Sequence, residues 1–153
     1  VIGREMIAIC SPARLAARRA AGLWDTPAGL LGEPLLYHSN GMDNWTRWFE
    51  AAGVRREGLK LAGGFDQVSI LVRAVMADMG IAVLQRCLLQ DDLQSGRVAA
   101  PFPDLRIAIS RGYHLCAPPQ RRDHYALACF RQWLLDTARQ DPDNTAPAPG
   151  TAV

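Results

Sequence analysis

Polar side chains that could bind a small molecule follow three short apolar runs of this sequence. Ser39 and Asn40 follow the first run, Asp66 and Gln67 follow the second, and Gln85 follows the third. In an α/β protein, ligands bind at the edge where the carboxyl ends of parallel strands meet. Free N–H groups at the start of the helices that come next attract carboxylates and other polar groups. The pattern predicts a ligand site at this edge of the sheet.

The same stretches also have a purely structural interpretation. Asp43 and Asp66 stand where a carboxylate caps a helix N-terminus, and their polar neighbours could simply be solvated. Trp45, Trp48 and Phe49 recur at i, i+3 and i+4, which is typical of a helix face that packs in the core. We interpret this stripe as core or interface rather than as a surface that stacks on a ligand.

Signatures of catalysis and of metal binding are not found in the sequence. It contains no GxSxG, no HExxH, no P-loop and no GxGxxG after a strand. Four cysteines stand far apart, without the close pairs that zinc sites use. We therefore expect no enzyme activity, no metal and no cofactor. Cys10, Cys116 and Cys129 stand in apolar surroundings that are typical of small buried residues. We expect free buried thiols in a reducing cytoplasm, and a disulfide or metal role is the alternative.

Composition indicates a soluble globular protein. Of 153 residues, 49% are hydrophobic and 21% are charged, and the mean hydropathy is −0.04. The net charge is only +2, and no dense basic run predicts a DNA-binding surface. No signal peptide and no membrane span are expected. Because Val1 is not an initiator methionine, we expect the chain to be a piece of a longer protein.

Short apolar strands alternate with helices along the chain. Expected strands cover 6–10, 34–38, 59–62, 81–84, 105–109 and 113–116, and expected helices cover 14–21, 27–32, 44–52, 67–79, 86–95 and 122–139. Such alternation predicts an α/β layered fold with a largely parallel sheet.

The order of several short motifs resembles that of LysR-type transcriptional regulators. W-x-x-W-F-x-A-A-G at 45–53 is similar to the branch that contains the glycine-cleavage activator and the β-lactamase regulators. The resemblance extends over about 1–138. Its motifs are ICSP at 9–12, LLYHS at 35–39, NWTRWFEAAG at 44–53, GIAVL at 80–84, LQSGRV at 93–98 and FRQWL at 130–134.

This resemblance implies the fold of type 2 periplasmic binding proteins. The chain would then hold one complete Rossmann-like subdomain and part of a second. Residues 1–10 would be a hinge strand from subdomain one, and 11–110 would form regulatory subdomain two. Residues 111–140 would supply the return strand and C-terminal helix of subdomain one, followed by a flexible tail over 141–153.

Carried over by position, the resemblance also implies an effector site between the subdomains. One departure from the family is Gln85, which stands where proline often follows the GIAxL motif. The implied site residues are Ser39, Asn40, Phe65, Asp66, Gln67, Ser69 and Tyr113.

The function implied is sensing of a small polar or anionic effector by a cytoplasmic bacterial regulator. Self-association as a dimer or a larger oligomer is expected, because the final helix would lack its usual neighbours. DNA would be bound only through an N-terminal helix-turn-helix that this chain does not contain, and no membrane partner is expected. Two alternatives remain at this point: a periplasmic-type solute-binding protein of the same fold, or an interaction module that binds no effector.

Overall fold

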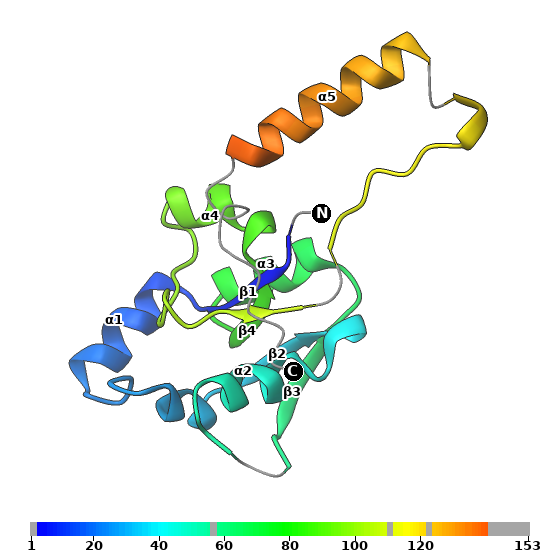
Figure 1. Ribbon diagram of the computed structural model, residues 1–153. Helices are drawn as coiled ribbons and strands as arrows, with labels where there is room; N and C mark the ends of the chain where they lie inside the picture. The colour runs from blue at the N-terminus through cyan, green and yellow to red at the C-terminus, as the bar shows by residue number, and fades with distance from the viewer. Residues whose placement is uncertain (1–2, 56–57, 110–111, 122–123, 141–153) are drawn as a thin grey trace.

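A five-stranded sheet forms the centre of the molecule (Figure 1). The computed structural model describes residues 3–55, 58–109, 112–121 and 124–140. Strand order is β3-β2-β4-β1-β5. The strands are β1 (Glu5–Ile9), β2 (Leu35–His38), β3 (Leu61–Phe65), β4 (Ile81–Gln85) and β5 (Ile107–Ala108).

The α/β fold predicted from the sequence is confirmed, but the sheet is mixed rather than largely parallel. Strand β2 runs parallel to β3 and β4, whereas β1 runs antiparallel to both of its neighbours, β4 and β5. An apolar run such as 6–10 identifies a buried strand, but its composition does not fix the direction in which the strand enters the sheet.

Helices connect the strands and cover both faces of the sheet. The α-helices are α1 (Pro12–Ala20), α2 (Asn44–Ala51), α3 (Val68–Met76), α4 (Gln90–Gln94) and α5 (Tyr125–Gln140). Short 3-10 helices are η1 (Pro27–Gly32), η2 (Ser39–Gly41), η3 (Arg86–Leu88) and η4 (Pro119–Arg121).

Two apolar cores lie on opposite faces of β1, because successive side chains of a strand point to opposite sides. Met6 and Ala8 face the core that α2 supplies, where Trp45, Trp48 and Phe49 are at most 1% exposed. Ile7 and Ile9 face the core supplied by α3. The interpretation of the aromatic stripe as core is therefore confirmed.

Strand β3 begins later than predicted and contains two glycines. A Cβ atom at Gly64 would lie only 2.7 Å from the Tyr37 ring. The absence of a side chain thus lets Tyr37 of β2 lie across β3. Because glycine is disfavoured in strands, the sequence pattern predicted that this strand ends before Gly63.

The region after β5 also departs from the expected elements. Residues 114–118 are irregular, and Tyr113 makes only an isolated bridge, so the predicted strand over 113–116 is wrong. Helix α5 follows and stands apart from the sheet (Figure 1). None of its side chains is buried, and Trp133 is 60% exposed. The predicted tail over 141–153 lies outside the described residues.

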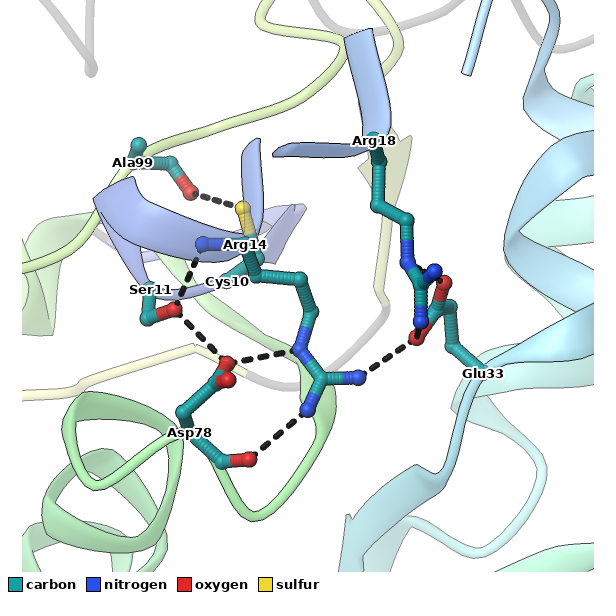
Figure 2. Close-up of polar contacts among 7 residues, drawn as sticks. All are labelled: Cys10, Ser11, Arg14, Arg18, Glu33, Asp78 and Ala99. Atoms are coloured by element: carbon teal, nitrogen blue, oxygen red, sulfur yellow. Dashed lines mark hydrogen bonds and ion pairs between the residues drawn. The ribbon is translucent and has the colours of Figure 1, made fainter. Parts of the chain in front are cut away.

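A cluster of charged residues joins three connections at the amino ends of β2 and β4 (Figure 2). Arg14 lies between two acids: its NH1 is 2.5 Å from Glu33 Oε2, and its Nε is 2.7 Å from Asp78 Oδ1. Its NH2 also donates to the Asp78 carbonyl, and Ser11 Oγ donates to the Asp78 carboxylate, both over 2.7 Å. Arg18 adds a second ion pair to Glu33. We call Ser11, Arg14, Arg18, Glu33 and Asp78 the ionic cluster.

The cysteines are all free but differ in exposure. Cys10 is fully buried beside the ionic cluster, and burial raises the pKa of its thiol to about 12. Cys87 is half-buried. The expectation of buried thiols is wrong for Cys116 and Cys129, which are exposed because they lie on the irregular segment and on α5.

Candidate functional site

A cavity of about 400 Å³ opens at the edge where β2 and β4 end and β1 begins. Its volume falls within the range of small-ligand pockets. Polar side chains form much of the wall, together with a few apolar ones. The described lining residues are Met6, His38, Asn40, Gly41, Asp43, Asn44, Arg47, Val68, Leu84, Gln85, Ile109 and Tyr113.

Two of the site residues predicted from the sequence, Asn40 and Tyr113, line this cavity. The other five are not among its described lining residues, although they adjoin His38 and Val68 in the chain or in space. Gln67 and Ser69 are exposed at the start of α3. A binding role for the remaining residues stays a prediction. They are Ser39, Phe65, Asp66, Gln67 and Ser69.

Hydrogen bonds hold the ends of β2 and β3 together beside the cavity. Ser39 Oγ donates to the Asp66 carboxylate and, over 3.3 Å, to the Phe65 carbonyl. Asp66 thus bonds to Ser39 rather than capping α3, whose N-cap residue is Gln67. His38 Nδ1 accepts from the Asn40 N–H, and its Nε2 lies 3.0 Å from the Asp66 carbonyl oxygen. Both contacts are satisfied together by the tautomer that carries its proton on Nε2.

Arg47 is the one Lys or Arg side chain among the described residues of the wall. Its NH2 donates to the Ala108 carbonyl over 2.9 Å, and no ion pair joins it to a described acid. A guanidinium has five N–H donors, so most of its donors stay available. Sequence reasoning missed this residue. The available signal was its spacing of three from Asn44 on α2, which places both side chains on one flank of the helix.

Gln85 and Tyr113 meet at the opposite wall. The Tyr113 hydroxyl donates to Gln85 Oε1 over 3.2 Å, and Gln85 Nε2 donates to the Gly3 carbonyl over 2.6 Å. Burial, and then the nearby Cys87 thiol, raise the pKa of Tyr113. The Tyr113 phenol is therefore protonated at neutral pH and can act as a hydrogen-bond donor.

Asp43 lies at the start of α2 and is among the described lining residues of the cavity. It occupies the N-cap position but makes no side-chain capping bond, so the predicted cap is wrong. Its backbone is already helical, with φ −84° and ψ −7°, whereas a capping side chain needs an extended backbone.

We looked among the described residues for groups of metal-ligating side chains and for helices that could span a membrane. Across these residues, no group of three or more His, Cys, Asp or Glu side chains could hold a metal ion. No described helix is long and apolar enough to cross a bilayer.

A layered α/β unit with a polar cavity at the carboxyl edge of its sheet has an architecture common among domains that bind small molecules. Residues 2–139 match the family model described as the LysR substrate binding domain. The chain therefore belongs to the LysR substrate-binding domain family.

Relatives of known name are transcriptional regulators. The chain is 37% identical to the HTH-type transcriptional regulator TrpI of Pseudomonas aeruginosa over 75% of its own length and 38% of that protein. It is 23% identical to the glycine cleavage system transcriptional activator of Escherichia coli K12, over 90% of its length and 44% of the activator. The chain thus spans less than half of each of these two relatives.

Solved effector domains share the fold. The AmpR effector binding domain from Citrobacter freundii superposes with a TM-score of 0.68 at 24% identity, covering 90% of this chain and 65% of that one. The named relatives favour the regulator over the solute-binding alternative.

Proposed function

We propose that this chain senses a small polar or anionic metabolite for a cytoplasmic bacterial transcriptional regulator. The observation that carries the proposal is Arg47, a cation with available donors in the wall of a ligand-sized cavity. A guanidinium matches the two oxygens of a carboxylate and binds them with paired hydrogen bonds. The cavity therefore suits a ligand that carries one carboxylate.

The rest of the wall divides into polar and apolar parts. Asn40 and Asn44 also line the cavity, and the Asn44 amide can bind further polar atoms of the ligand. Met6, Val68 and Leu84 supply an apolar surface for its body. No step of this binding requires a cofactor or catalysis, so we propose a sensor and not an enzyme.

Sensing requires that the ligand bind one arrangement of the protein better than another. A ligand with equal affinity for two arrangements shifts neither, however tightly it binds. We propose that the ligand changes how subdomains and protomers are arranged, and that DNA is bound by a helix-turn-helix outside this chain. The division at 10 and 110 into two subdomains stays part of this proposal.

A thermal-shift screen of the full-length protein tests the ligand site. The panel is glycine, L-serine, N-acetylmuramic acid and benzoate, followed by calorimetry on any compound that raises the melting temperature. Arg47→Met should weaken binding at least about tenfold, since a charge-assisted hydrogen bond is lost. Arg73→Met, at an exposed position of α3 that is not among the described lining residues, is the matched control and should leave the affinity unchanged. Equal affinity of the wild type and Arg47→Met would remove Arg47 from the site.

The same calorimetry examines the residues implied by the resemblance. Ser39→Ala and Gln67→Ala should lower affinity less than Arg47→Met does, because neither side chain is among the described lining residues. Undiminished affinity in both variants would exclude these two residues from the site. No hit from the panel would favour the module that binds no effector.

Self-association is proposed from the exposed apolar side of α5. Tyr125, Phe130 and Trp133 are 83%, 47% and 60% exposed, and the Phe130 and Trp133 rings lie 5.7 Å apart. Exposed patches of this kind mark surfaces that pack against another chain or segment. Sedimentation should show dimers or larger species, and a well-behaved monomer at high concentration would contradict this.

A further inference from the structure

We infer that Gln85 is a positioning residue that links the cavity to the place where the chain enters and leaves this α/β unit. Two segments lie side by side there, Gly3–Arg4 before β1 and Gly112–Tyr113 after β5. We call them the crossing. The Ile109 N–H donates to the Arg4 carbonyl over 2.9 Å. This bond places the start of the segment that follows β5 beside the segment that precedes β1. The inference rests on the proposed function of the cavity as a ligand site.

A single side chain bridges both segments of the crossing. Gln85 donates to the Gly3 carbonyl on the entering segment and accepts from the Tyr113 hydroxyl on the leaving one. Gln85 itself is the last residue of β4, in the middle of the sheet, and pairs with Met6 of β1. The Gln85 side chain therefore joins both segments of the crossing to β4 by hydrogen bonds. A proline at this position could make neither bond, because its side chain has no polar atom.

Close packing reinforces the two hydrogen bonds. Gly3 has φ +75°, and a Cβ atom there would lie 2.8 Å from Cys87 Sγ and 2.9 Å from the Tyr113 ring. Only glycine fits this backbone and this space. Gly3, Cys87 and Tyr113 thus lie close together, so a shift of the crossing would change the contacts among them.

Gln85 and Tyr113 also line the cavity. A ligand that takes the Gln85 carbonyl oxygen or the Tyr113 hydroxyl competes with the bond between them, and a ligand that bonds to both strengthens their alignment. In either case, occupancy of the cavity changes the strength of the hydrogen bonds by which Gln85 joins the two segments of the crossing. Ligand binding is then transmitted to the segments that connect this unit to the rest of the protein.

Cys87 supplies a reporter that needs no ligand. In a Cys116→Ser, Cys129→Ser background the two exposed thiols are removed, and Cys10 is buried with a raised pKa, so Ellman's reagent reports on Cys87. Gln85→Met keeps the volume of the side chain but removes both hydrogen bonds. The Cys87 rate should rise about tenfold or more in this variant, and about fivefold in Tyr113→Phe, which loses one bond.

Gln94→Met, on the exposed side of α4, is the matched control and should leave the rate unchanged. Circular dichroism checks that each variant is folded. A Cys87 rate within twofold of the control in both Gln85→Met and Tyr113→Phe would overturn the inference. If Gln85→Met does not fold, Tyr113→Phe, which changes a half-exposed side chain, decides the question alone.

A second measurement separates this inference from the proposed function. Glycine, L-serine, N-acetylmuramic acid and benzoate are added at saturating concentration, and the Cys87 rate is measured with and without each. A compound that binds should change the rate at least threefold in the Cys116→Ser, Cys129→Ser background. It should leave the rate unchanged when Gln85→Met is added and calorimetry shows that this variant still binds the compound. Binding without any change of rate in the Cys116→Ser, Cys129→Ser background would refute the coupling while leaving the ligand site intact. Absence of binding by all four would count against the ligand site, and the rates without ligand would still decide the role of Gln85.

Discussion

The two ends of the central sheet use polar residues in opposite ways. At the amino ends of β2 and β4, Arg14 makes ion pairs with Glu33 and Asp78, and its side chain is only 11% exposed. At the carboxyl ends of the same strands, Arg47 lines a cavity and contacts one carbonyl oxygen. Arg14 is thus paired with acids of the protein itself, whereas Arg47 keeps hydrogen-bond donors available.

This difference indicates which polar residues stabilise the fold and which are available for a ligand. A buried carboxylate without a partner is costly, so loss of one member of the ionic cluster must lower the free energy of unfolding. A guanidinium that stays in contact with solvent makes little difference to that free energy. Substitutions at the two ends should therefore separate stability from binding.

The largest expected effect comes from Arg14→Met. Glu33, whose side chain is 5% exposed, would keep only Arg18 as a partner, and Asp78 would lose its bonds to Arg14. The free energy of unfolding should fall by about 3 kcal/mol. Urea unfolding followed by circular dichroism measures it. A matched control is Arg106→Met, which breaks a more exposed pair with Glu5 and should cost no more than about 1 kcal/mol. Equal losses in the two variants would contradict the difference between buried and exposed ion pairs.

A smaller effect is expected at Asp78, which has φ +59° although it is not glycine. Asp78→Ala loses the bonds to Arg14 and Ser11 and keeps the unfavourable backbone, and it should lower stability by about 2 kcal/mol. Asp78→Gly loses the same bonds but relieves the backbone, so it should be about 1 kcal/mol more stable than Asp78→Ala. The same urea experiment compares the two variants. If alanine were the more stable, the left-handed backbone would cost nothing here.

Acid should weaken the ionic cluster through the same aspartate. The hydrogen bond from Arg14, and then that from Ser11, hold the pKa of Asp78 below its ordinary value. A lowered pKa in the folded state stabilises the protein fully above the ordinary value of about 3.9, and this contribution is lost as pH falls below it. The wild type should lose stability between about pH 5 and 2 more steeply than Asp78→Asn, as urea unfolding across that range would show. Parallel profiles would mean that Asp78 carries none of the acid sensitivity.

Much of the fold could be predicted from local patterns. Continuous apolar runs at 6–10 and 81–84 became the central strands β1 and β4, and the aromatic spacing of Trp45, Trp48 and Phe49 became the face of α2 that packs in the core. The direction of β1 and the position of β3 were not predictable in this way. The first depends on how the chain enters the sheet, and the second on the close approach of Tyr37 to Gly64.

The two polar ends differ in how much of them the sequence could reveal. Asn40 and Gln85 were indicated at the cavity because residues that follow parallel strands gather at one edge. The ionic cluster had no such signal, since Arg14 is separated from Glu33 by 19 residues and from Asp78 by 64. Arg47 was hidden for another reason: it stands between two core tryptophans at positions 45 and 48, where the apolar face dominates the pattern.

The smallest effect on stability is expected at the cavity end. Arg47→Met removes one hydrogen bond, to the Ala108 carbonyl at the edge strand β5, and leaves no buried acid without a partner among the described residues. The free energy of unfolding should change by no more than about 1 kcal/mol, although ligand affinity should fall at least about tenfold. Urea unfolding and calorimetry on the same preparation give both numbers. A loss as large as that of Arg14→Met would show that Arg47 serves the fold, and the cation of the cavity would then no longer distinguish a binding end from a structural one.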